Sequence, residues 1–266
     1  TEAAPQAVAV LPTAATEQHG PHMAVGTDII LCENVARRAA ERAAERTPVI
    51  VAPILPFGSS WHHYPFGGTI SLTSPTFIIA VQEALEGLVR CGFRKIVVLN
   101  GHGGNSDHVG VVGQDLVNRL DHPVTVATGN YWDIARPALL EKNLLDSSLI
   151  PGHAGRFETS IMMALRPDMV REEGLKRVHD VSEDDSGLDV DLTGAVVQVH
   201  GTWAKGPGHT DNPAAADAEL DTCKQRVEED RREIEDGHIR IVNKSHTPPN
   251  QETYHRADLD APSDRR

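Results

Sequence analysis

Cysteine is scarce in this chain of 266 residues, because Cys32, Cys91 and Cys223 are the only three and stand far apart. An odd number of widely spaced cysteines is poor material for a disulfide framework, and it lacks the paired spacing of a zinc–thiolate site. The chain also lacks any apolar run that approaches the length of a membrane span. These absences predict a protein of the reducing cytoplasm that does not enter a membrane.

The chain also has few basic residues. It contains 25 Lys and Arg but 38 Asp and Glu, which gives a formal net charge of −13. Nucleic acids and anionic membrane surfaces bind clustered Lys and Arg, so the balance argues against both as partners. An anionic small substrate remains compatible, because a bound divalent metal reverses the local field.

Short apolar segments alternate along the chain with segments of helical periodicity. Strands are expected at 7–11, 49–55, 95–100 and 124–128, and helices at 28–46, 74–91, 108–120, 158–165 and 213–236. The alternation is typical of an α/β fold, here a single three-layer domain with a mostly parallel sheet flanked by helices. We expect this domain to cover 1–243, with an acidic excursion at 171–192, and 244–266 to be a polar, proline-rich tail.

The strongest motif is EQHGPHMAVGTD, directly after the first expected strand. Glu17 and His19 are two residues apart, so their side chains share a face if the backbone stays extended. A carboxylate beside an imidazole is a suitable ligand pair for Zn²⁺ or Mn²⁺. Asp28 can return a second carboxylate at the start of the next helix. Singly, Asp28 is equally well a helix N-terminal residue and His19 a polar loop residue; together they favour a metal.

The second motif, NGHGGN, follows the third expected strand and contains His102. A phosphate-binding glycine loop is the alternative, but neither Lys-Ser/Thr nor G-x-G-x-x-G is present. Ligands of parallel sheets collect at the carboxyl ends of the strands, which places His102 at the same edge as the first motif. Asn100 and Asn105 are candidates to orient metal ligands from a second layer.

The third motif is HAGRFETS, from His153 to Ser160. Glu158 lies in the expected first helical turn and is a candidate ligand, although an acid there is also favoured by the helix dipole alone. His153 is a candidate proton donor, since imidazole titrates near neutral pH.

Aromatic and histidine side chains form a weaker group of candidates. Trp61, His62 and His63 are assigned to a substrate pocket or a subunit contact, with either histidine as an alternative metal ligand. Trp132 in YWD is a candidate to stack on substrate, although a tryptophan after a strand is more often part of the core. No serine lies in a G-x-S-x-G turn, so a serine hydrolase has little support.

The order and spacing of EQHGPH with TD, NGHGGN, YWD and HAGxxETS resemble the creatininase (creatinine amidohydrolase) family, from about Val8 to Leu165. The resemblance implies a single α/β domain with two divalent ions, Zn²⁺ and/or Mn²⁺, in a homo-oligomer that is commonly a hexamer. It implies that one metal is held by Glu17, Asp28 and His102, and the other by His19 and the bridging Asp28. It also implies that His153 transfers protons and that Trp132 lines the pocket.

Two positions depart from the family pattern. Creatininase reads Gly-His-Tyr-Glu at the glycine loop, and that Glu binds the second metal; here the position is Gly104, and Glu158 is the candidate replacement. The family's second pocket tryptophan falls at Leu149, which argues against creatinine itself as the substrate.

These observations predict a metal-dependent hydrolase that uses a metal-activated water to cleave a C–N bond in a cyclic amide or related small amide. An alternative is ring-opening C–C hydrolysis of an oxidised inositol of the 3-dehydro-scyllo-inosose type or another cyclic ketone, since the polar loop at 61–64 favours a hydrophilic substrate. A third hypothesis is a non-catalytic metal-binding homologue, which retention of His153 disfavours. The expected partner is a small polar cyclic molecule.

Overall fold

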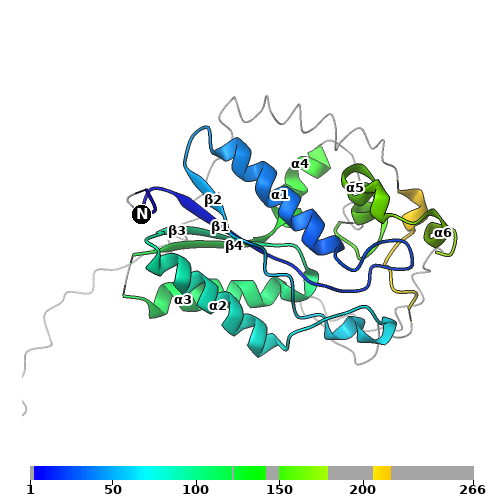
Figure 1. Ribbon diagram of the computed structural model, residues 1–266, viewed down its shortest axis with the longest axis horizontal. Helices are drawn as coiled ribbons and strands as arrows, with labels where there is room; N and C mark the ends of the chain where they lie inside the picture. Colours follow the sequence, from blue (N-terminus) through cyan, green and yellow to red (C-terminus); the bar gives the residue numbers. More distant parts are fainter. Residues whose placement is uncertain (1–2, 122, 142–149, 179–205, 217–266) are drawn as a thin grey trace, which may run out of the picture.

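The structure is a computed structural model that describes residues 3–121, 123–141, 150–178 and 206–216 (Figure 1). Its sheet comprises β1 (Val8–Thr13), β2 (Val49–Val51), β3 (Lys95–Asn100) and β4 (Thr125–Asn130). The order across the sheet is β2-β1-β3-β4, and all three pairings are parallel. The expected parallel sheet is therefore confirmed.

Helices cover both faces of this sheet, as Figure 1 shows. On one face lie α1 (Thr27–Ala43), α4 (Tyr131–Glu141) and α5 (Arg156–Leu165), and on the other α2 (Ser74–Arg90) and α3 (Ser106–Arg119). Shorter elements are η1 (Trp61–Phe66), η2 (Gly103–Asn105), η4 (Pro167–Met169), α6 (Glu172–Leu175) and η7 (Pro213–Ala215). The three-layer α/β architecture follows, and no helix within the described ranges is long and apolar enough to cross a membrane.

The helices form where the sequence places apolar residues on one side. In α2, Phe77, Val81, Leu85 and Val89 recur at intervals of four and are buried against the sheet and α3. Thr73 caps this helix by accepting a hydrogen bond from the backbone N–H of Thr76. Burial of each large side chain contributes about 1.5–3 kcal/mol to folding, so the apolar stripe fixes how α2 lies on the sheet.

Element boundaries differ from expectation in two places. β2 ends at Val51 rather than continuing to Leu55, because Pro53 follows and has no N–H for the ladder; only an isolated bridge joins Leu55 to Thr13. Helix α4 was not expected, since it begins at Tyr131 directly after β4 with no loop between them. Most of the expected helix at 213–236, part of the excursion at 171–192 and all of the 244–266 tail lie outside the described residues.

The last rung between β1 and β3 positions the two strongest motifs. Thr13 and Asn100 are Cα partners there, and the Thr13 hydroxyl donates to Oδ1 of Asn100 at 3.1 Å. The pairing continues one residue further, where the Gly101 N–H donates to the Thr13 carbonyl at 2.8 Å. The loops that carry Glu17 and His102 therefore leave neighbouring strands at the same level.

Candidate metal centre

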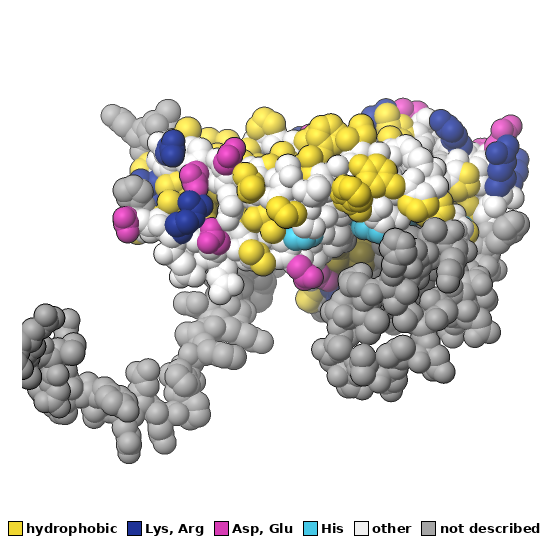
Figure 2. Space-filling view, turned by 90° about the horizontal axis from the view of Figure 1, so that it is seen from below, with side chains coloured by type: hydrophobic (Ala, Val, Ile, Leu, Met, Phe, Trp, Pro, Cys, Tyr) yellow, Lys and Arg dark blue, Asp and Glu magenta, His cyan; other side chains and the backbone are white. Residues whose placement is uncertain are grey.

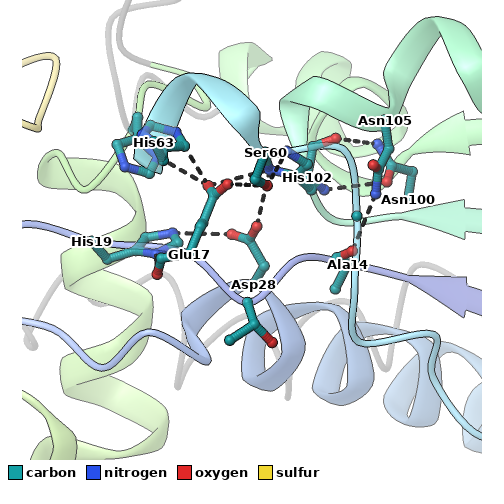
Figure 3. Close-up of polar contacts among 12 residues, drawn as sticks. Ala14, Glu17, His19, Asp28, Ser60, His63, Asn100, His102 and Asn105 are labelled. Carbon is teal, nitrogen blue, oxygen red and sulfur yellow. Dashed lines mark hydrogen bonds and ion pairs between the residues drawn. The ribbon is translucent and has the colours of Figure 1, made fainter. Parts of the chain in front are cut away.

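Acidic and imidazole side chains from separate loops converge beyond the carboxyl ends of β1 and β3 (Figure 3). They come from the loop after β1, the first turns of α1 and α5, and the glycine loop after β3. The five predicted ligands are all at most 4% exposed: Glu17, His19, Asp28, His102 and Glu158. The structure thus brings together every residue for which the sequence predicted a metal-binding role.

Asp28 lies between two imidazoles and presents one carboxylate oxygen to each. Its Oδ1 is 3.0 Å from Nε2 of His19, and its Oδ2 is 3.2 Å from Nδ1 of His102. The opposite ring nitrogen of each histidine faces a carbonyl: Nδ1 of His19 donates to the Glu17 carbonyl at 3.2 Å, and Nε2 of His102 donates to the Ser59 carbonyl at 3.1 Å. These contacts leave both inner nitrogens directed at Asp28, and once deprotonated they have the orientation that a ligating histidine requires.

Two further carboxylates flank Asp28. Oε1 of Glu17 lies 3.2 Å from Nδ1 of His102, and the Ser60 hydroxyl donates to Oε2 of Glu17 at 2.6 Å. On the other side, Oε2 of Glu158 lies 3.7 Å from Nε2 of His19 and accepts the Ala154 N–H at 2.6 Å. The centre therefore has a Glu17–His102 half and a His19–Glu158 half, which Asp28 joins.

The close packing of these groups shifts their pKa values strongly. Burial lowers the pKa of His19, but neighbouring carboxylates, Asp28 first among them, outweigh burial and raise it to about 10. The same balance, with Glu17 as the main opposing charge, raises the pKa of His102 well above its usual value. Burial raises the pKa of Glu158 to about 8, partly opposed by His19. Protons are thus held in positions that a divalent cation would take.

The donor set fits a pair of divalent metal ions. Groups of three His, Asp or Glu residues offer ligand atoms within 4.8 Å of one another, including Glu17 with His19 and Asp28. Three buried carboxylates in one cluster are costly unless positive charge balances them, and mixed imidazole and carboxylate donors suit Zn²⁺ and Mn²⁺. Two such ions would lie one on each side of the Asp28 carboxylate.

His153 lies at the edge of this centre and is held by Gln18. The Gln18 side-chain Nε2 is 3.0 Å from Nε2 of His153 and 3.0 Å from Nδ1 of His63. The second nitrogen of each ring, Nδ1 of His153 and Nε2 of His63, lies 3.5 Å from Oε1 of Glu17. Burial, reinforced by His19, lowers the pKa of His153 well below its usual value, so this imidazole is neutral at pH 7.

A cavity of about 640 Å³ opens onto the centre, and several predicted substrate-binding residues line it. His62, His63 and Trp132 lie in its wall, and Trp132 is also packed into the core at 4% exposure. Trp61 does not line it: its side chain is 59% exposed, and its indole N–H donates to the Leu72 carbonyl. The prediction that Trp61 contacts substrate is therefore not supported within one copy of the chain.

Asn100 and Asn105 support the loops and not the ligand side chains. The Asn100 amide donates to the His102 carbonyl at 2.6 Å, and Oδ1 of Asn105 accepts the Ser59 N–H at 2.9 Å. The Nδ2 group of Asn105 donates to the Ala14 carbonyl at 3.2 Å. Both residues thus fix the backbone that carries the ligands. They were predicted to orient the ligand side chains themselves.

Ser60 and Gln18 also contact the centre, although neither was among the residues expected there. Ser60 contacts both Glu17 and His102, with its Oγ 2.9 Å from Nε2 of the latter. The only signal for Gln18 was its position between two ligands, and strict alternation would have pointed it away from them. Gly20, at φ 63°, turns the chain directly after the motif, and the Gly20 N–H donates to Oε1 of Gln18.

The backbone of Gly104 and the side chain of Glu158 lie on different sides of Asp28. A Cβ at Gly104 would lie 2.3 Å from the Ser59 carbonyl and 2.5 Å from Nε2 of His102. Gly104 therefore borders the Glu17–His102 half, whereas Glu158 lies beside His19 in the other half. Glu158 thus supplies a carboxylate beside His19, in the half to which the resemblance assigns the second metal, and its role as the replacement ligand stays a prediction.

Comparison with known proteins agrees with this geometry. The family model described as creatinine amidohydrolase matches residues 1–221. The chain belongs to the creatininase family. Creatinine amidohydrolase of Pseudomonas putida is 36% identical over 63% of this chain and 68% of its own length. Mycofactocin precursor peptide peptidase of Mycobacterium tuberculosis is 33% identical over 62% of this chain and 61% of its own length.

Solved creatininase-family structures share the fold. One described as the manganese form of creatininase superimposes with a TM-score of 0.67 at 30% identity and covers 86% of this chain and 91% of its own. The matched segments span about two thirds of the curated relatives, and the structural match spans most of both chains. Family membership and the ligand cluster together make this creatininase-family chain a metal-dependent hydrolase.

Proposed function

We propose that this creatininase-family protein hydrolyses a C–N bond in a small cyclic amide or related amide. The observation that carries the proposal is the placement of Asp28, whose two oxygens face His19 and His102 at 3.0 and 3.2 Å. A carboxylate between two imidazoles, with a further carboxylate on each side, is a donor set for two cations. Bound there, the cations would supply an activated water and a Lewis acid for the substrate carbonyl.

The proton transfer that amide cleavage needs is assigned to His153. Its imidazole is neutral, buried at 8% exposure, and lies in the wall of the cavity next to Glu17. A neutral imidazole accepts a proton and then donates it to the departing nitrogen, which without protonation is a poor leaving group. Gln18 keeps the ring oriented toward Glu17.

The cavity wall indicates a polar substrate. It includes Ser59, Ser74, Asp107 and His108, all with hydrogen-bonding side chains. Such a wall accommodates the carbonyl and amino groups of a cyclic amide. It also suits a polyhydroxylated ring, and this polar lining is the observation that favours ring-opening C–C hydrolysis of a cyclic ketone as the second candidate.

A substrate panel with metal control tests the proposal. Purified protein is assayed with creatinine, an N-formyl amide, a short peptide and an oxidised inositol, before and after chelator treatment with verified metal removal. We expect turnover of an amide that disappears with the metal and returns on adding Zn²⁺ or Mn²⁺. Turnover of the cyclic ketone alone would establish the second candidate, and full activity without metal would refute both.

We also infer that the chain forms a homo-oligomer in the cytoplasm. Val25, Trp61, Tyr64 and Ile70 are each more than two-fifths exposed, and the rings of Trp61 and Tyr64 pack edge to face with centroids 5.4 Å apart. Hydrophobic side chains gather on the face seen in Figure 2, and exposed apolar clusters are typical of subunit contacts. Light scattering coupled to size exclusion gives the mass directly, and a monomer at all concentrations would refute the oligomer.

A further inference from the structure

Each half of the proposed metal centre has one imidazole and two carboxylates, but the surroundings of the two halves differ. The His19 half has an imidazole, the Asp28 carboxylate and the Glu158 carboxylate. The other half has His102, the second oxygen of Asp28, and Glu17, whose Oε1 is also 3.5 Å from both His63 and His153. Glu17 thus has several imidazoles around it, so its half is the one in which a further imidazole ligand is within reach.

The glycine loop cannot provide this donor. Gly103 and Gly104 have no side chains, and a Cβ at 104 would collide with the Ser59 carbonyl at 2.3 Å. A candidate comes from η1, which begins one residue after Ser60. Ser60 itself bonds to Glu17, so the start of η1 is tied to this half of the centre.

His62 offers a ring nitrogen at this place. Ligand atoms of Glu17, His62 and His102 all lie within 4.8 Å of one another. The His62 ring is stacked on that of His102, with centroids 5.9 Å apart and planes 7° from parallel. His62 is half-buried in the wall of the cavity, whereas its neighbour His63 is 1% exposed and faces Gln18. The two adjacent histidines therefore have different surroundings.

We propose that His62 is a direct ligand of the metal ion held by Glu17, Asp28 and His102. The inference rests on the proposed metal centre and completes it. This half then has two imidazoles and two carboxylates, while the His19 half has one imidazole and two carboxylates. Imidazole-rich sites favour Zn²⁺ and Co²⁺, and oxygen-rich sites favour Mn²⁺, so the two positions differ in metal preference.

Metal binding by His62 variants tests this assignment without an activity assay. Full-length wild type, His62→Ala and His62→Glu are freed of metal, titrated with Zn²⁺, Co²⁺ or Mn²⁺, and compared by elemental analysis and calorimetry. We expect two equivalents in wild type, with one site weakened more than about 100-fold in His62→Ala, beyond the about 10–100-fold loss typical of an outer partner. His62→Glu restores the second equivalent and shifts its preference toward Mn²⁺.

Controls separate this inference from the function on which it rests. Trp61→Phe alters the neighbouring side chain, which lies outside the cavity wall, and should leave both equivalents and the Co²⁺ absorption spectrum unchanged. Two equivalents in His62→Ala with a loss below about 100-fold would overturn the role of His62 while leaving the metal centre intact. Wild type that binds no metal would refute the centre itself. Circular dichroism confirms that each variant is folded.

Discussion

The Ser60 hydroxyl donates a 2.6 Å hydrogen bond to Oε2 of Glu17, although the two residues are 43 positions apart in the chain. The bond fixes the carboxylate so that Oε1 faces His102. We predict that Ser60→Ala lowers metal affinity about 10–100-fold, as loss of an outer hydrogen-bond partner typically does. Calorimetric titration measures the change. Ser59→Ala is the matched control, because its backbone carbonyl, which bonds to His102, is retained.

Adjacent glycines in the loop after β3 give a second prediction. Gly104→Ala places a methyl group 2.5 Å from Nε2 of His102, so the imidazole or the Ser59 backbone must shift. Gly103→Ala meets nothing within 4 Å. We expect Gly104→Ala to lose at least about 10-fold in metal affinity, comparable to loss of a positioning contact, and Gly103→Ala to keep it. Equal affinities for both variants would show that this loop tolerates displacement.

His153 provides a prediction about rate. If its imidazole moves the proton to the leaving group, His153→Ala lowers kcat by about 10²–10⁴-fold. Metal stoichiometry should stay at the wild-type value, because His153 is not among the proposed ligands. Steady-state kinetics with the best substrate of the panel, beside elemental analysis, make the comparison. Unchanged kcat with full metal content would remove His153 from the mechanism.

Gln18 should act through His153. Its Nε2 contacts both His153 and His63, so Gln18→Leu leaves the two rings without the amide that orients them. We predict a fall in kcat of about 10-fold or more with a smaller change in KM, since only proton transfer depends on ring orientation. The Gln18→Glu variant retains the shape and shifts the pH profile of kcat by adding a charge beside His153. A purely structural role would lower thermal stability without moving that profile.

Metal binding should release protons. In the metal-free protein the pKa of His19 is about 10 and that of His102 is raised, so both imidazoles carry a proton at pH 7. The pKa of Glu158, about 8, also places a proton there at neutral pH. A ligand must be deprotonated to bind, so affinity rises as pH increases. Calorimetry in two buffers of different ionisation enthalpy counts the protons, and zero release would contradict these pKa shifts.

Much of the fold could be predicted because each element carries its own signal. KIVVLN is apolar and β-branched between polar residues, and β3 covers those same residues, Lys95–Asn100. The stripe from Phe77 to Val89 similarly marks α2. Helix α4 was missed because its N-terminus has no separating loop and its interior contains Pro137, which normally argues against a helix.

Most of the candidate site was predictable because its residues either open a helix, as Asp28 and Glu158 do, or follow a strand. Glu17 and His102 do so, and the topology of parallel sheets brings such positions to one edge. Ser60 and His62 lie in a long irregular connection between β2 and α2, whose path over the centre depends on tertiary hydrogen bonds. No periodic pattern in the sequence predicts the path of this connection. His62 could therefore be named only as an alternative ligand, and Ser60 was not named at all.

The shared rung between Thr13 and Asn100 has a consequence for how new specificities arise in this scaffold. Glu17 and His102 depend on the two central strands, whereas Ser74, His108 and Trp132 in the cavity wall come from helices around them. Substitutions at these three wall positions would therefore change the fit of a substrate without removing a proposed metal ligand. Preference for one substrate over another can thus diverge at helix positions while the ligands at the strand ends stay in place.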